Sequence, residues 1–180
     1  SFSTVINYSF EIVTPDEITA PMALGWYDIP NSIRSSISEP GEEDFFTFEG
    51  SIGQRVYLDR LNPLNNGSLS FSLYSPAGKR VFGAKNFVSG HESASITLTE
   101  NGTYRVRING AGDDTGNYSF SLRDLEQATS ATLDQVYSGI LEPGEASHLY
   151  QFTATANQRL FIDYQDNSGS VYNDRAKWIL

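Results

Sequence analysis

Apolar and polar side chains alternate with a period of two along several short stretches of the chain. This alternation places the apolar side chains on one face of an extended strand and the polar ones on the other. Aromatic and β-branched residues fill the apolar positions, as half-buried strands prefer. The pattern predicts β-strands at Tyr8–Ile12, Leu69–Leu73, Tyr104–Ile108 and Tyr118–Leu122.

Glycine, proline and asparagine separate these stretches and predict turns. Asn101-Gly102 lies between two apolar alternations and predicts a β-hairpin. The stretch from Asp124 to Asp134 is predicted to be a linker with at most one helical turn. Short, evenly spaced strands with polar turns favour an all-β fold, an antiparallel β-sandwich of jelly-roll-like form.

Three segments of the sequence occur twice, which indicates tandem repeats. The first two pairs follow each other in the same order, with one residue of difference in the intervening spacing. The third pair relates the start of the chain to a predicted closing strand. The matched segments are Glu39–Glu42 with Glu142–Glu145, Gln54–Asp59 with Gln158–Asp163, and Asn7–Phe10 with Asn117–Phe120.

These matches divide the chain into three parts. Residues 1–12 are interpreted as the closing strand of a preceding repeat, residues 13–125 as a complete β-sandwich repeat, and residues 126–180 as the first part of a following one. We therefore expect a piece of a longer repetitive protein, as stacked repeats suggest. The alternative is that the two incomplete ends complement each other by strand addition, within one chain or between chains. Residues 126–180 are not expected to fold alone, because half a sandwich leaves one sheet face uncovered.

Charge and composition exclude several classes of function. The formal net charge of −10, without a basic stripe, argues against nucleic-acid binding. The absence of cysteine excludes a disulfide framework and a thiolate metal site. No run of about 18 apolar residues is present, so membrane insertion is not expected.

Four segments in a fixed order resemble the bacterial pre-peptidase C-terminal domain family. They are Gly41–Phe48, Leu73–Gly78, Gly102–Ile108 and Gly116–Leu122. The resemblance covers about residues 30–123 and, more loosely, residues 136–180. It implies a jelly-roll-like β-sandwich on secreted or cell-surface bacterial proteins, generally non-catalytic, of which some relatives bind calcium and an extracellular polymer such as collagen or polysaccharide. The second copy departs from the pattern, because Ser147-His148 stands where Asp44 and its neighbour would be.

Catalytic residues are not predicted. The two histidines, His91 and His148, lie in polar settings and are interpreted as surface residues. The chain contains neither a G-x-S-x-G elbow nor an H-E-x-x-H motif. The chain is therefore not expected to be an enzyme.

Calcium is the one cofactor that the sequence brings into consideration. Asp113 and Asp114 lie on the glycine-bent stretch 110–116, and Asp44 follows two glutamates, so carboxylate oxygens of the kind that calcium prefers are present. The alternative for the 110–116 stretch is a solvated hairpin loop. The alternative for Glu42, Glu43 and Asp44 is strand-edge charge that discourages aggregation.

Trp26 and Tyr27 are candidate ligand-binding residues, because an exposed flat ring matches the apolar face of a sugar; the alternative is packing between repeats. The first hypothesis for the function is a non-catalytic structural or assembly repeat whose partners are neighbouring repeats or like subunits. The second is a module that binds an extracellular polysaccharide or matrix protein, with or without calcium. The third is a subunit of a filament formed by β-strand complementation.

Overall fold

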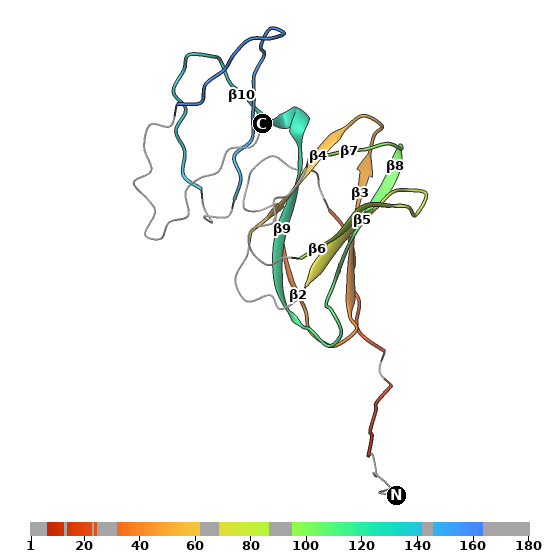
Figure 1. The fold of residues 1–180 in the computed structure, drawn as a ribbon. Helices are drawn as coiled ribbons and strands as arrows, with labels where there is room; N and C mark the ends of the chain where they lie inside the picture. Colours follow the sequence, from red (N-terminus) through yellow and green to blue (C-terminus); the bar gives the residue numbers. More distant parts are fainter. Residues whose placement is uncertain are drawn as a thin grey trace, which may run out of the picture.

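The computed structural model describes residues 7–12, 14–22, 24, 32–61, 69–86, 95–141 and 146–163. Within these residues, the regular structure is almost entirely β (Figure 1). None of the described helices is long and apolar enough to span a membrane.

Two sheets form the body of the fold. The first has five strands in the order β1-β3-β8-β5-β6, and the second has four in the order β2-β9-β4-β7. The strands of the first sheet are β1 (Thr19–Pro21), β3 (Glu43–Gly50), β8 (Gly102–Asn109), β5 (Ser70–Tyr74) and β6 (Arg80–Asn86). Those of the second are β2 (Ile33–Ile37), β9 (Gly116–Asp124), β4 (Arg55–Arg60) and β7 (Ser95–Thr97). All pairings inside these sheets are antiparallel except β1 with β3, which is parallel.

The core lies between the two sheets, which confirms the β-sandwich prediction. Alternate residues of β8 and β9 point inward, as the period of two predicted, and are at most 2% exposed: Tyr104, Val106, Ile108, Tyr118, Phe120 and Leu122. Phe46 of β3 crosses from the other sheet to contact the rings of Tyr118 and Phe120 edge-on, at centroid distances of 6.2 and 5.6 Å. Such pairs add about 0.5–1.5 kcal/mol each to the burial energy.

The hairpin prediction at Asn101-Gly102 was wrong. β7 pairs with β4 in one sheet, whereas β8 pairs with β3 and β5 in the other, so this connection crosses between sheets. Leu98 holds the crossing in place, because its backbone exchanges 2.8 Å hydrogen bonds with Gly53 and Gln54 beside β4. Gly102 then enters β8 at a φ of +126°, a conformation that glycine adopts without strain.

The stretch 110–116 also crosses between the sheets, because β8 and β9 belong to different ones. The hairpin alternative for this loop was therefore wrong in its topology. Asp113 is exposed and Asp114 half-buried, and the Asp114 N–H donates to the Ala111 carbonyl across 3.2 Å.

A second, smaller region follows β9. A single 3-10 turn, η2 (Leu125–Gln127), is capped by the Asp124 side chain and leads into β10 (Thr129–Ser130). The single turn agrees with the prediction for Asp124 to Asp134, but the same stretch also holds the last residue of β9 and the paired strand β10, so a plain linker is not what the structure has there. β10 pairs in parallel with β11 (Tyr150–Gln151), as β1 does with β3. In Figure 1 this region lies beyond the end of β9, at the end of the sandwich opposite the N-terminal segment.

Residues 7–12, for which a strand was predicted, make no strand pairing within the described part of the chain. Tyr8, Phe10 and Ile12 are 84%, 76% and 88% exposed. The two rings stack on each other at 6.5 Å, as side chains two residues apart do on an extended segment. The division of the chain into repeats stays a prediction.

Candidate functional site

For Glu42, Glu43 and Asp44, the alternative of strand-edge charge was wrong for two of the three residues. Glu42 is buried and accepts hydrogen bonds from the Ser38 hydroxyl at 2.8 Å and from the Glu39 N–H at 3.1 Å. Asp44 has an exposed fraction of 0% and occupies a core-facing position, two residues before Phe46. Only Glu43 carries surface charge, and it forms an ion pair with Arg107.

Asp44 is held by two donors inside the fold. The Ile18 N–H donates to one carboxylate oxygen at 2.9 Å, and the Tyr118 hydroxyl donates to the other. Burial, and then this hydrogen bond, raise the pKa of Tyr118 far above its ordinary value, so the phenol stays protonated. Asp44 therefore ties the segment before β1 to both sheets of the sandwich.

The calcium assignment of Asp113, Asp114 and Asp44 stays a prediction. Asp44 lies in the core on β3, whereas Asp113 and Asp114 lie on the connection between β8 and β9. Among the described residues, no three acidic or histidine side chains gather in a group that could hold a metal ion. Trp26 and Tyr27, the candidate ligand-binding aromatics, lie outside the described residues, as does His91.

A cluster that the sequence did not predict joins the sandwich to the region after it. Asp59 of β4 and Arg123 of β9 form an ion pair, with side chains 2% and 4% exposed. Ser147, from the segment before β11, donates its N–H to Asp59 at 3.1 Å and its hydroxyl to the other oxygen at 2.9 Å. Arg123 also donates to the Ser147 carbonyl, and the Tyr57 hydroxyl lies 3.0 Å from the Ser147 hydroxyl. We call Tyr57, Asp59, Arg123 and Ser147 the junction cluster.

The electrostatics of the junction cluster follow from its burial. Desolvation raises the pKa of Asp59 above its ordinary value, and the Arg123 guanidinium and the Ser147 hydrogen bonds oppose that rise. Such a pair is stable only when hydrogen bonds satisfy its remaining polar atoms, and Ser147 supplies them. The segment that contains Ser147 therefore supplies the hydrogen bonds that stabilise Asp59 and Arg123 as a buried pair.

His148 adjoins the junction cluster, and is half-buried rather than the surface histidine that was expected. Burial and the nearby Arg123 charge lower the pKa of His148. Its ring packs closely against Gly139, where an added Cβ would lie 2.8 Å from the histidine Cε1. The imidazole is thus held neutral at physiological pH by its surroundings.

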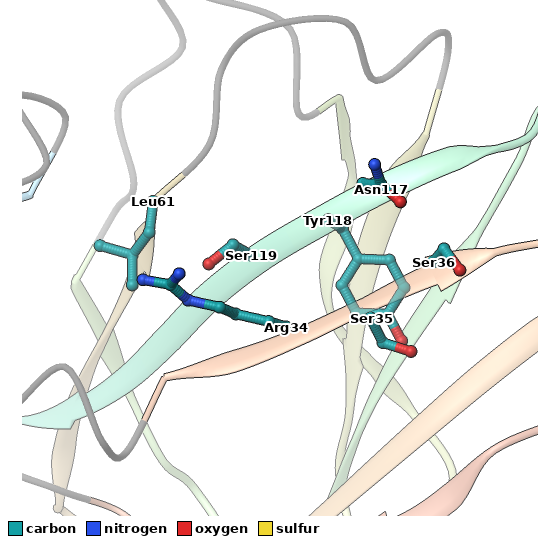
Figure 2. A pocket seen from close by; sticks show the side chains of 7 residues that line it. All are labelled: Arg34, Ser35, Ser36, Leu61, Asn117, Tyr118 and Ser119. Carbon is teal, nitrogen blue, oxygen red and sulfur yellow. The ribbon is translucent and has the colours of Figure 1, made fainter.

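A groove of about 500 Å³, with polar and apolar groups in its lining, lies over β2 and β9. It is lined by Arg34, Ser35, Ser36, Leu61, Asn117, Tyr118 and Ser119. Figure 2 shows the Arg34 side chain extending from β2 toward Leu61 and Ser119. The Ser119 residue is 7% exposed, and its hydroxyl has no hydrogen-bond partner within the described part of the chain. Guanidinium, hydroxyl and amide groups of this kind bind polar ligands through directed hydrogen bonds.

Of these features, only the core position of Asp44 could be anticipated from the alternation of β3. The sequence held a signal for the junction cluster that was not interpreted as one. Asp59 recurs as Asp163 in the second copy, and Ser147 stands at the departure from the family pattern. The pair itself joins residues 64 positions apart, and period-two alternation carries no information on that pairing.

Comparisons with known proteins give structural likenesses only. No family model matches the sequence, and no curated protein matches it. Among solved structures, the periplasmic g-type lysozyme inhibitor PliG of Aeromonas hydrophila is 11% identical, with a TM-score of 0.47, over 62% of this chain and 99% of that one. The pre-peptidase C-terminal domain of a Bacillus anthracis collagenase is 14% identical, with a TM-score of 0.45, over 63% and 100%. PliG of Salmonella Typhimurium is 16% identical, with a TM-score of 0.40, over 59% and 98%.

Proposed function

We propose that this chain is a non-catalytic structural module of a large secreted or cell-surface bacterial protein, in which β-sandwich units are joined in a fixed relative orientation. The observation that carries the proposal is the junction cluster. A flexible linker between independent domains exposes its polar groups to water, whereas Asp59 and Arg123 are buried against Ser147 of the next segment.

Two further observations support this function. The parallel pairing of β10 with β11 repeats that of β1 with β3, so both regions begin in the same way. The recurring segments Gln54–Asp59 and Gln158–Asp163 extend the likeness beyond these strands. A module of this kind acts by spacing and orienting, and its partners are neighbouring units.

Residual dipolar couplings test the fixed orientation directly. In the unaltered chain, amides of the sandwich and amides of residues 128–163 are expected to fit one common alignment tensor. Ser147→Ala removes the two side-chain hydrogen bonds to Asp59 and Tyr57, and is expected to separate the two tensors. Thr153→Ala, an exposed position of the same segment, is the matched control and should leave one tensor. Two independent tensors in the unaltered chain would refute the proposal.

The groove over β2 and β9 favours a second function, the binding of an extracellular polysaccharide. Arg34 and Asn117 line it with a guanidinium and an amide group, and sugar hydroxyls both donate and accept hydrogen bonds. Retention of the unaltered chain on insoluble polysaccharides would support this function if Arg34→Ala abolishes it. The control is Arg55→Ala, at an exposed position of β4, which should be retained. No retention on a broad panel of polysaccharides would exclude it.

A further inference from the structure

Residues 7–12 carry the sequence of a core strand but lie exposed. Their sequence, Asn-Tyr-Ser-Phe-Glu-Ile, matches Asn-Tyr-Ser-Phe-Ser-Leu at residues 117–122 of β9. In β9 the three apolar side chains are between 0% and 2% exposed, whereas their N-terminal counterparts are between 76% and 88% exposed. The segment is already extended, with its rings on one side. It therefore presents an apolar strand face that no sheet among the described residues covers.

β9 shows which environment such a sequence occupies when it is folded. It lies between β2 and β4, antiparallel to both. Phe120 stands opposite Ile33 of β2, and Leu122 stands opposite Leu58 of β4. A strand of this sequence is thus flanked by two partners whose apolar residues meet its own.

The counterparts of both flanking strands are present after the junction cluster. Counting back from the repeated Glu-Pro-Gly-Glu segment aligns residues 136–140 with β2, and the second repeated segment aligns residues 159–163 with the start of β4. Val136 and Ile140 are 78% and 80% exposed, and Leu160 and Ile162, which align with the core-facing Val56 and Leu58, are 41% and 42% exposed. Within the described residues, no strand pairs with either stretch.

We propose that residues 7–12 of one copy of this chain insert as a strand between residues 136–140 and 159–163 of a second copy. This deepens the proposed function, on which it rests, by naming the partner of the module as a like chain joined head to tail. Repetition of the contact builds a head-to-tail assembly, a filament or a closed ring, because the donor segment and the acceptor region are different surfaces.

The contact must form between chains. Six residues lie between Ile12 and Thr19 of β1, so the seven residue steps reach at most about 25 Å when fully extended. β9 alone, with its nine residues, is about 30 Å long. β1 is paired to β3 near the N-terminal end of the sandwich, and the acceptor region lies beyond the opposite end (Figure 1). While β1 remains paired, the donor segment cannot reach the acceptor region of its own chain.

The register of β9 fixes which residues meet. Phe10 is placed opposite Val136, Ile12 opposite Ile162, and Glu11 opposite Asp163. The last pair brings two carboxylates together where β9 and β4 have Ser121 and Asp59. Like charges directly opposite each other weaken strand pairing, so Glu11→Ser is expected to strengthen the association.

Sedimentation velocity over a concentration series tests the proposal. The unaltered chain is expected to form concentration-dependent oligomers, and Ile12→Asp to weaken the association at least about tenfold. The matched control is Ile52→Asp, which alters an isoleucine that is 65% exposed in the turn before β4, outside the proposed contact. Glu11→Ser is expected to shift association toward lower concentration.

Cysteine cross-linking tests the register, since the chain has no native cysteine. A mixture of Glu11→Cys chains and Asp163→Cys chains should oxidise mainly to the mixed dimer. A mixture of Ser9→Cys and Asp163→Cys chains should do so much less, because residue 9 is two positions out of register.

A chain that stays monomeric over the whole concentration range overturns the inference, as does an oligomer that Ile12→Asp leaves intact. Equal cross-linking from residues 9 and 11 also overturns it. Failure of the proposed function would be a different result from failure of the strand exchange, because it would be seen as two independent alignment tensors within the monomer. A single tensor in a strict monomer would retain the structural module and reject the strand exchange.

Discussion

Asp59→Asn replaces one carboxylate of the junction cluster by a neutral amide of nearly the same shape. The exchange preserves packing, and one oxygen can still accept from Arg123 and from the Ser147 N–H. It removes the negative charge that forms the ion pair with the Arg123 guanidinium, which is 4% exposed. Removing one partner of such a buried pair costs about 3–5 kcal/mol. We expect a loss of this size in the free energy of unfolding.

Urea denaturation followed by circular dichroism measures this loss, provided that the slope of the transition is unchanged. The double variant Asp59→Leu with Arg123→Met removes both charges and is expected to cost less than the sum of Asp59→Leu alone and Arg123→Met alone, although it leaves the Ser147 N–H without its Asp59 acceptor. Together with the two single variants it closes a cycle that isolates the interaction between the two side chains.

The matched control is the surface pair of Glu43 with Arg107, whose side chains are 32% and 29% exposed. Glu43→Gln is expected to cost less than about 1 kcal/mol, because water screens an exposed pair. If Asp59→Asn costs no more than this control, the reasoning that the junction cluster is buried and charge-coupled is wrong.

Three further predictions concern titration and metal. Tyr118→Phe removes a donor from buried Asp44 and is expected to lower the free energy of unfolding by about 1–3 kcal/mol. Because the pKa of Tyr118 is raised in the fold, the parent should also lose stability as pH rises above about 10, and Tyr118→Phe should lose less over the same range. The pKa of His148 is lowered in the fold, so the unfolded state binds the proton more readily, and stability should fall as pH drops through about 6.5. In His148→Gln, the midpoint of thermal unfolding should fall less over the same pH range. If Asp113 and Asp114 bind calcium, excess calcium should raise the unfolding midpoint and a chelator should reverse the rise, whereas an unchanged midpoint would reject the site.

The sequence allowed the sandwich core to be predicted because its residues obey a local rule. Tyr104, Val106 and Ile108 alternate with polar residues, and this period alone assigns them to one buried face. The connection at Asn101-Gly102 did not follow from the same rule. Turn chemistry reports only the local backbone. The choice between a hairpin and a crossing depended on Leu98, whose hydrogen-bond partners lie 44 and 45 residues earlier in the sequence, beside β4.

Asp44 and Asp59 show where alternation stops being informative. Asp44 lies on the core-facing side of β3, so its burial follows from the pattern, and only its partners had to be learned from the structure. Asp59 lies on the outward side of β4, where the pattern predicts a solvated charge, yet it is 2% exposed. A charge on an outward position loses its water only if another layer covers that side of the sheet.

That second layer is the segment of Ser147, and its presence changes the meaning of the ion pair. Isolated on an open sheet, Asp59 and Arg123 would form an ordinary surface pair that contributes little. Covered by Ser147, the same two residues form a buried pair whose remaining polar atoms are satisfied by hydrogen bonds from and to the Ser147 backbone. The directional contacts at the junction therefore come from polar groups, in contrast to the apolar burial that holds the sandwich itself together. Because hydrogen bonds are directional and apolar burial is not, a junction built in this way fixes an angle between units as well as an affinity, which is the property that a spacing module requires.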